Sequence, residues 1–239
     1  MACDVCGKPY EPHTYTYTGR VRQVYVRSCA CKEARNVRQE AEDRAVALRH
    51  FSISAAGYRH MTLANWRDNG IESAVHEYMK NVRKGEAGCW LMLFGPYGTG
   101  KTHMAVAIIR QLFLDRNWTP GIIRWAEFCS RIQQGWQDRS VSSDWTTAYS
   151  AGILVIDDLD KKMPTAWALG QLFEVLDYRY IHRCPTICTA NRPLRELNSL
   201  WGAENLRDLK DAIISRMAEM ATGIEFKGDD YRFRRRSAC

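Results

Sequence analysis

The sequence contains no apolar run that approaches the roughly 20 residues needed to span a bilayer. Its first residues, Met1-Ala2-Cys3-Asp4, also lack the basic and then apolar character of a secretory signal. Both absences argue against a membrane protein or a secreted one, and we expect a cytoplasmic protein. Because the cytoplasm is reducing, the nine cysteines are not expected to form a disulfide framework.

Acidic residues are in the minority. The 239-residue chain has 27 Asp and Glu against 34 Lys and Arg, which gives a formal net charge of +7. This excess favours a polyanionic partner, most simply nucleic acid, although basic proteins without such a partner are common. Hydrophobic residues make up 46% of the chain, enough for a real core, and the length has room for one large domain and a small one.

Residues 95–102 carry the clearest motif. They read GPYGTGKT and fit G-x-x-x-x-G-K-[ST], the phosphate-binding loop of P-loop nucleoside triphosphatases. An apolar run of strand length precedes the loop and a helix-prone run follows it. In that context the glycines let backbone N–H groups close on a polyphosphate, and the helix N-terminus adds partial positive charge. A chance glycine-rich turn is the alternative interpretation.

The loop predicts an ATP and Mg²⁺ site. Lys101 would reach the β- and γ-phosphates, and the Thr102 hydroxyl would hold Mg²⁺. The residues of the loop expected to bind the nucleotide are Gly95, Pro96, Tyr97, Gly98, Thr99, Gly100, Lys101 and Thr102.

Residues 153–158, ILVIDD, form the second motif. Four consecutive apolar residues suit a buried central strand of a parallel sheet, and the acidic pair follows at the edge where α/β sheets bind ligands. Asp157 would position Mg²⁺, and Asp158 would orient or deprotonate the attacking water. Many ATPases carry Glu at the second position, which leaves the hydrolysis rate open. A strand that simply ends in acidic turn residues is the alternative.

Residues 185–191, PTICTAN, predict another buried strand that ends in a polar side chain. Asn191 is well placed at its end to hydrogen-bond the γ-phosphate or the attacking water, and so to report the state of the nucleotide.

Two cysteine pairs near the start predict a zinc site. Cys3 and Cys6 form C-x2-C, and Cys29 and Cys31 form C-x-C, separated by a β-hairpin pattern that turns near Gly19. The hairpin would bring the pairs together, and four thiolates around zinc give a closed structural site. A segment this short needs such a metal to fold. The alternatives are that the thiols are unpaired or redox-sensitive, or that a ligand is replaced by His13.

The other cysteines sit in apolar or helix-like surroundings and are expected to be buried small hydrophobes. They are Cys89, Cys129, Cys184 and Cys188.

Hydrophobic periodicity predicts the remaining elements of the larger part. Helices are expected at residues 71–83, 126–136, 166–181 and 208–220, and strands at 121–125 and 223–227. Residues 137–145 are polar and predict a loop. Near it lie arginines that would face either a nucleic-acid path or ordinary solvent, namely Arg124, Arg131 and Arg139.

We divide the chain into an N-terminal domain at 1–50, a linker at 51–64 and an ATPase domain at 65–239. A predicted helix at 32–50 has a face of mixed charge, which either docks on a partner protein or faces solvent.

The ordered set of motifs resembles the DnaC/DnaI-type helicase loaders, and the related IstB transposition ATPases share it. The segments that carry the resemblance are 95–103 (GPYGTGKTH), 153–158 (ILVIDD), 189–191 (TAN), 214–216 (ISR) and 228–232 (GDDYR). The resemblance covers about residue 51 to the end and indicates the initiator clade of AAA+ ATPases. An N-terminal cysteine cluster ahead of such a domain is more similar to the loaders than to the transposition proteins.

This resemblance implies an α/β fold, with an AAA+ P-loop NTPase core around a central parallel sheet and no C-terminal lid domain, preceded by the small zinc-binding domain. It adds His103 to the nucleotide-binding stretch. It also identifies Arg216 as an arginine finger that acts in trans on ATP bound by a neighbouring subunit. The catalytic residues that it implies are Lys101, Asp157, Asp158, Asn191 and Arg216.

The function that we expect is ATP-dependent loading of a replicative helicase. The N-terminal domain would bind the hexameric helicase. The AAA+ domain would bind ATP, Mg²⁺ and single-stranded DNA, and would self-assemble through Arg216. One alternative is an IstB-like accessory ATPase that hands target DNA to a transposase, and another is a passive adaptor that binds nucleotide only as a structural ligand.

Overall fold

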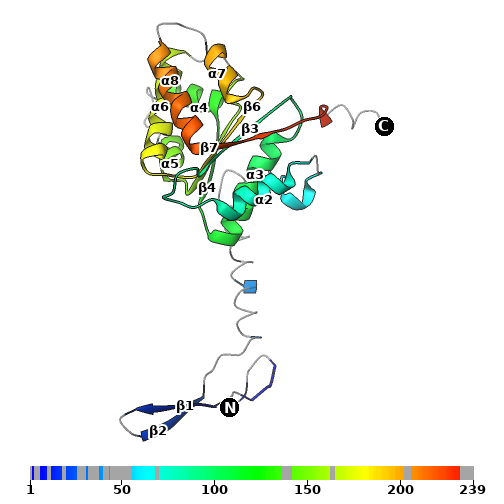
Figure 1. Ribbon diagram of the computed structural model, residues 1–239, viewed down its shortest axis with the longest axis vertical. Coiled ribbons are helices and arrows are strands. Elements are labelled where there is room, and N and C mark those ends of the chain that lie inside the picture. Colours follow the sequence, from blue (N-terminus) through cyan, green and yellow to red (C-terminus); the bar gives the residue numbers. More distant parts are fainter. Residues whose placement is uncertain are drawn as a thin grey trace. The chain divides into compact units, whose positions relative to one another are not determined.

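The chain divides into two compact units, Met1–Ala47 and Leu48–Cys239. The computed structural model describes residues 2, 6–9, 12–17, 20–25, 31, 38–39, 43, 55–67, 70–135, 142–161, 165–201 and 206–231. The two units are described separately (Figure 1).

The first unit contains a β-hairpin. Strand β1 (Pro12–Tyr17) pairs antiparallel with β2 (Arg20–Tyr25), and the register places Tyr17 opposite Arg20. The predicted hairpin is thus confirmed in its two paired strands, which the β-branched and aromatic residues of this segment favour. The turn predicted near Gly19 lies outside the described residues. The predicted helix at 32–50 lies almost wholly outside the described residues.

The second unit is built around a five-stranded parallel sheet. Its order is β4-β5-β6-β3-β7, and every neighbouring pair is parallel. The strands are β3 (Trp90–Phe94), β4 (Pro120–Arg124), β5 (Ile153–Asp157), β6 (Thr186–Ala190) and β7 (Ala221–Glu225). Strands β5 and β6 are buried along their whole length, as expected for a parallel sheet whose two faces are both covered. The predicted central parallel sheet is confirmed.

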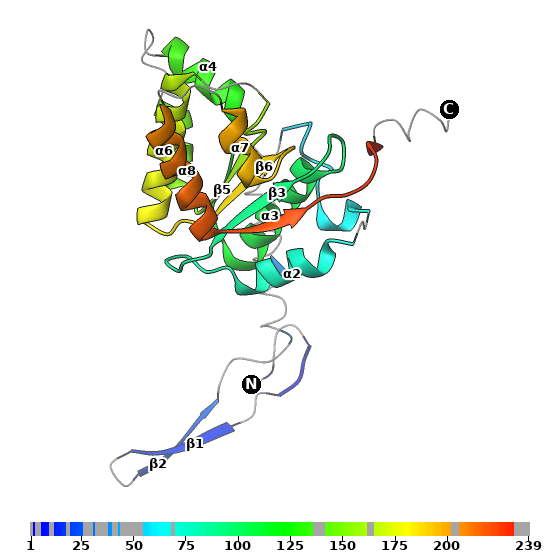
Figure 2. The ribbon, with the colours of Figure 1, turned by 45° about the horizontal axis from the view of Figure 1, so that its top comes forward.

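Helices cover both faces of this sheet. Figures 1 and 2 show α2 and α3 on one side, with α6 and α8 packed together on the other. The helices of the described part of this unit are η3 (Leu63–Asn65), α2 (Glu72–Asn81), α3 (Lys101–Arg116), α4 (Trp125–Gly135), α5 (Ser142–Ser150), α6 (Ala166–Ile181), α7 (Leu194–Leu200) and α8 (Arg207–Met220). Among the described residues no helix is long and apolar enough to cross a membrane.

The prediction of a loop at 137–145 is wrong for its last residues, because α5 already begins at Ser142. Serine and threonine are weak helix formers, so the sequence of α5 gives little helical signal of its own. The helix is held by packing: the Trp145 ring meets Phe128 edge-on at 5.5 Å and stacks on Tyr149 at 5.3 Å. Tertiary contacts therefore decide the structure of this segment.

Candidate nucleotide-binding site

The phosphate loop joins β3 to α3 and depends on glycine at its two ends. Gly95 has φ of 139° and Gly100 has φ of 94°, in a region that other residues rarely adopt. A Cβ on Gly95 would collide with the carbonyl oxygen of Phe226, and one on Gly100 would lie 2.6 Å from the Trp66 ring. The glycines therefore permit both the turn and the close approach of neighbouring segments.

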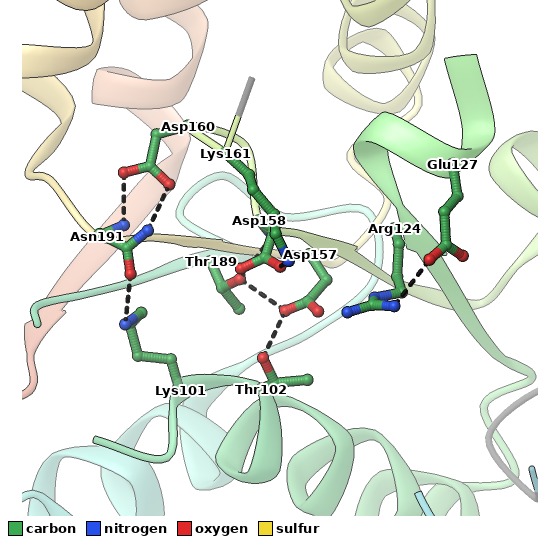
Figure 3. A network of polar contacts seen from close by, with 10 residues as sticks. All are labelled: Lys101, Thr102, Arg124, Glu127, Asp157, Asp158, Asp160, Lys161, Thr189 and Asn191. Atoms are coloured by element: carbon green, nitrogen blue, oxygen red, sulfur yellow. Dashed lines mark hydrogen bonds and ion pairs between the residues drawn. The ribbon is translucent and has the colours of Figure 1, made fainter. Parts of the chain in front are cut away.

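Lys101 is buried at the first position of α3 and points its ammonium group back along the loop. Its Nζ donates hydrogen bonds to the carbonyl oxygens of Gly95 (2.8 Å) and Pro96 (2.7 Å) and to Asn191 Oδ1 (3.0 Å), as Figure 3 shows for the last of these. The structure thus brings together the lysine of the loop and the polar residue at the end of β6. An ammonium held at this point is positioned to meet a polyphosphate on the loop.

The two side chains expected to hold Mg²⁺ are in direct contact. The Thr102 hydroxyl donates to Asp157 Oδ1 at 2.8 Å, and the Thr189 hydroxyl donates to the same oxygen at 2.7 Å (Figure 3). Asp157 is only 1% exposed. Burial raises its pKa, the hydrogen bond from Thr189 opposes that rise, and the nearby charge of Asp158 adds to it. Hydroxyl and carboxylate oxygens side by side fit the hard oxygen ligands that Mg²⁺ prefers.

Asp158 ends the strand in an unusual backbone conformation. Its φ is 62°, in the left-handed region where Asp is one of the few tolerated residues. The N–H of Asp158 donates to Thr189 Oγ1 (2.9 Å), and its carboxylate forms an ion pair with Lys161 (3.1 Å). The acid predicted to act on water therefore lies beside Asp157 and is paired with a lysine (Figure 3).

Asp160 is a site residue that the sequence analysis missed. Its carboxylate accepts hydrogen bonds from both the backbone N–H (2.7 Å) and the side-chain Nδ2 (3.0 Å) of Asn191. The available signal was a third acid two positions after the pair in the segment IDDLD. That signal is weak, because acidic residues are common in turns.

Arg124 and Tyr58 also lie close to Asp157. Arg124 ends β4 opposite Asp157 in the sheet register and forms a 2.7 Å ion pair with Glu127 on α4. Its predicted position, on a nucleic-acid path or facing ordinary solvent, stays open, and the structure adds that it lies beside the buried acid. Burial raises the pKa of Tyr58, and the charge of Asp157 raises it further. Tyr58 belongs to a stretch interpreted as a linker, so nothing in its sequence pattern indicated this position.

His103 was predicted to bind nucleotide, and its ring is engaged with the segment that precedes α2. Its Nε2 donates to the carbonyl oxygen of Thr62 (2.9 Å), and the ring meets Trp66 edge-on at 5.5 Å. Trp66 in turn meets Phe226 edge-on at 5.9 Å. Burial lowers the pKa of His103, which favours the neutral ring. His103 thus ties residues 60–66 to the start of α3.

The segment after β7 returns to the phosphate loop. The N–H of Phe226 donates to Phe94 O (2.7 Å), and the N–H of Tyr231 donates to Gly98 O (3.2 Å). A Cβ on Gly98 would collide with the Asp230 carboxylate. This placement explains part of the GDDYR motif in structural terms, because Asp230 and Tyr231 pack against Gly98 of the loop.

Arg216 is not brought to these residues by the fold of one chain. It lies on α8 and is paired with Asp177 on α6, with Nε to Oδ1 at 2.8 Å and Nη2 to Oδ1 at 2.6 Å. Its guanidinium also lies over the rings of Phe173 (4.7 Å) and Tyr180 (5.5 Å). The predicted action of Arg216 on a neighbouring subunit stays a prediction.

Two of the four predicted zinc ligands fall outside the described residues. Cys6 and Cys31 are described, whereas Cys3 and Cys29 are not. Within the described part of the chain no group of three or more His, Cys, Asp or Glu residues is arranged to hold a metal. The four-cysteine site therefore stays a prediction as well.

The chain is similar in sequence to several known proteins. Replicative helicase loader DnaI of Bacillus subtilis is 23% identical over 163 residues, which are 66% of this chain and 52% of that protein. A putative insertion sequence ATP-binding protein of Sinorhizobium fredii is 30% identical over 151 residues, 63% of this chain and 48% of that protein. The chain thus spans about half the length of these relatives.

Solved structures share the fold. The crystal structure of the DnaC helicase loader matches with a TM-score of 0.62 and 21% identity, over 72% of this chain and 100% of that one. The crystal structure of DnaI matches with a TM-score of 0.63 and 24% identity, over 71% and 94%. Replication initiator DnaA, solved with AMPPCP and single-stranded DNA, matches with a TM-score of 0.56 and 19% identity, over 71% and 50%.

The family model described as IstB-like ATP binding protein matches residues 18–239, nearly the whole chain. That match covers the phosphate loop, the Asp157 strand and the Asn191 strand, whose polar ends meet at one edge of the sheet. The AAA+ resemblance predicted from the motifs is confirmed. The chain belongs to the family of IstB-like ATP-binding proteins.

Proposed function

We propose that this protein is an ATPase that loads a replicative helicase onto single-stranded DNA. The observation that carries the ATPase part is the meeting of four predicted side chains at one sheet edge. Thr102 contacts Asp157, and Lys101 contacts Asn191, although these residues come from three separate segments. A loop that holds phosphates beside a pair of Mg²⁺ ligands is an arrangement suited to hydrolysis of a nucleoside triphosphate.

Each of these residues has a role in the proposal. Lys101 would hold the β- and γ-phosphates, and Thr102 and Asp157 would hold Mg²⁺, which supplies positive charge to the transferred phosphoryl group. Asp158 would orient the attacking water after leaving its ion pair with Lys161. Asn191 would contact the γ-phosphate or the water.

The helicase-loading part rests on the relatives and on charge. The relatives include a protein named as a replicative helicase loader, and the fold matches two helicase-loader structures. The net charge of +7 supports contact with the phosphates of DNA without base recognition. The N-terminal unit would bind the hexameric helicase, with zinc held by Cys3, Cys6, Cys29 and Cys31.

The sharpest test of the proposal combines ATP hydrolysis with DNA and helicase binding. Wild-type ATPase activity should rise with single-stranded DNA more than with duplex DNA, and Lys101→Ala should abolish it. The full chain should capture a replicative helicase and contain one zinc ion per chain by elemental analysis. Replacing Cys6 and Cys31 by Ser should release zinc and helicase while leaving ATP binding intact. A rate of ATP hydrolysis that neither single-stranded nor duplex DNA changes would reject the loading role.

A second candidate is an accessory ATPase of transposition. It is favoured by the 30% identical relative, which is named as an insertion sequence ATP-binding protein. In this role the protein would bind duplex target DNA in preference to single strands and would not capture helicase. The same hydrolysis and capture measurements therefore separate the two candidates.

A further inference from the structure

The chain that follows β5 continues along the end of β6 for three residues. The N–H of Asp158 donates to Thr189 Oγ1 (2.9 Å), and the N–H of Leu159 donates to Thr189 O (3.0 Å). The next residue, Asp160, reaches Asn191. Hydrogen bonds from two consecutive backbone N–H groups to Thr189 thus fix the path of the chain up to Asp160. This path places the Asp160 carboxylate next to Asn191.

The contacts of Asn191 select one orientation of its amide. Nδ2 donates to Asp160 Oδ1 (3.0 Å), and Oδ1 accepts from Lys101 Nζ (3.0 Å), as Figure 3 shows. Rotating the amide by half a turn would place its oxygen against a carboxylate and its NH₂ against an ammonium. Both contacts would be repulsive, because an ionised carboxylate only accepts and an ammonium only donates. Asp160 and Lys101 together therefore determine which way Asn191 faces.

We propose that Asp160 is a positioning residue, which orients the Asn191 amide and, through it, the Lys101 ammonium toward the γ-phosphate. The inference rests on the proposed ATPase function and deepens it. Asp160 accepts at both oxygens, from the backbone and the side chain of the same residue, so it fixes Asn191 at two points. Hydrogen bonds to an ionised acceptor are about twice as strong as neutral ones, so the Asp160 carboxylate restrains the Asn191 side chain strongly.

Asn191 still has one N–H donor available for the reacting groups while its amide is bonded to Asp160. The amide nitrogen carries two hydrogens, and the contact with Asp160 Oδ1 uses one of them. The other is the donor that would meet the γ-phosphate or the attacking water. Loss of Asp160 would leave that donor in place but unoriented, so the chemical step should suffer more than the capture of nucleotide.

The test compares single and double variants in steady-state ATP hydrolysis. Asp160→Ala should lower kcat by about 10- to 100-fold with KM within about threefold, since misplacement of a reacting contact acts on the chemical step. Asp160→Asn, which retains one acceptor oxygen, should fall between Asp160→Ala and wild type. Asn191→Ala should cost about as much as Asp160→Ala. The double variant should lose little more than either single variant, because both act through one contact.

A matched control exists on the surface of the same unit. Asn198 Nδ2 donates to Asp211 Oδ1 at 2.9 Å in an exposed pair on α7 and α8. Asp211→Ala removes an amide–carboxylate bond of the same kind outside the site, so it should leave kcat unchanged. Thermal melting of every variant shows whether it is folded, and Asp160→Asn serves where Asp160→Ala does not fold.

The affinity ratio of ATPγS to ADP provides a readout that does not depend on turnover. Asp160→Ala should bring this ratio moderately closer to one, because the Asn191 amide stays in place but is no longer oriented toward the γ-phosphate. Wild-type kcat and an unchanged ratio in Asp160→Ala, or additive losses in the double variant, would overturn the proposal. A wild-type chain that binds ATPγS but hydrolyses no ATP would overturn the ATPase function alone, with the ratio still deciding on Asp160. A chain that binds neither nucleotide would overturn both.

Discussion

The Thr189 hydroxyl connects the two acids that follow one another at the end of β5. It donates to Asp157 Oδ1 (2.7 Å) and accepts from the N–H of Asp158 (2.9 Å). Thr189 is fully buried, so neither contact is shared with bulk solvent. One side chain on β6 thus satisfies the buried carboxylate and also holds the left-handed backbone of the next residue.

Thr189→Val should damage the Mg²⁺ site. Valine keeps the shape but removes both hydrogen bonds, so that among the described residues Thr102 alone still donates to the buried Oδ1 of Asp157. We expect a loss of roughly 1–3 kcal/mol in unfolding free energy and a higher Mg²⁺ requirement for hydrolysis. Urea denaturation and Mg²⁺ titration measure the two effects. Thr189→Ser retains the hydroxyl and should stay near wild type; equal losses in both variants would contradict the hydrogen-bond explanation.

Gly100→Ala should cost more than backbone strain alone. Gly100 has φ of 94° and its added Cβ would lie 2.6 Å from the Trp66 ring. Gly85 is the matched control, because its φ is 84° and its Cβ would enter open space. Gly85→Ala should lose about 1–2 kcal/mol of unfolding free energy from the left-handed backbone. Gly100→Ala should lose clearly more and should weaken nucleotide binding, as thermal melting and a fluorescent ATP analogue would report.

Motifs with strict spacing were the part of the site that could be predicted from sequence. The hydrophobic pattern is clear in the helix that Lys101 and Thr102 begin, in the strand that Asp157 ends and in the strand that Asn191 follows. Because parallel strands end at one edge of a sheet, their meeting follows from the fold class. Their contacts at 2.8 Å and 3.0 Å agree with that expectation.

Contacts that depend on exact backbone paths could not be predicted. Asp160 reaches Asn191 because the loop after β5 runs along β6, and no local pattern encodes that path. Arg179 is a similar case: it lies in an apolar helix and is fully buried. It donates to carbonyl oxygens of Ala148, Ala151 and Pro185, which come from separate segments. Such a set of acceptors exists only once the chain has folded.

Two buried cysteines should resist alkylation in the folded protein, one directly before β3 (Cys89) and one within β6 (Cys188). Burial raises the pKa of Cys89 to about 11 and that of Cys188 to about 12, and both side chains are at most 2% exposed. The reactive species is the thiolate, so at pH 8 these thiols are almost wholly protonated. Iodoacetamide followed by peptide mass spectrometry should find both unmodified, with Cys184, which is partly exposed, labelled sooner. Denaturant should remove the difference, and rapid labelling of Cys188 without denaturant would contradict its placement.

The role of Arg216 can be tested through its partner. Arg216 is bound to Asp177 within one chain, whereas a trans-acting finger must reach the nucleotide of another. If it acts in trans, Arg216→Ala should lower kcat by about 10³-fold without loss of ATP binding. Asp177→Asn, which releases the guanidinium from its carboxylate, should then keep or raise kcat.

A purely structural role for Arg216 predicts a different pattern of results. Arg216→Ala and Asp177→Asn would lower the melting temperature together, and both would change kcat only as far as they change folding. An experiment that mixes two inactive variants distinguishes further between the two roles. Adding Lys101→Ala, which keeps Arg216 but lacks its own hydrolysis, to Arg216→Ala should restore activity if the arginine of one chain serves the nucleotide of another. No recovery in the mixture, with each variant folded by circular dichroism, would count against action in trans.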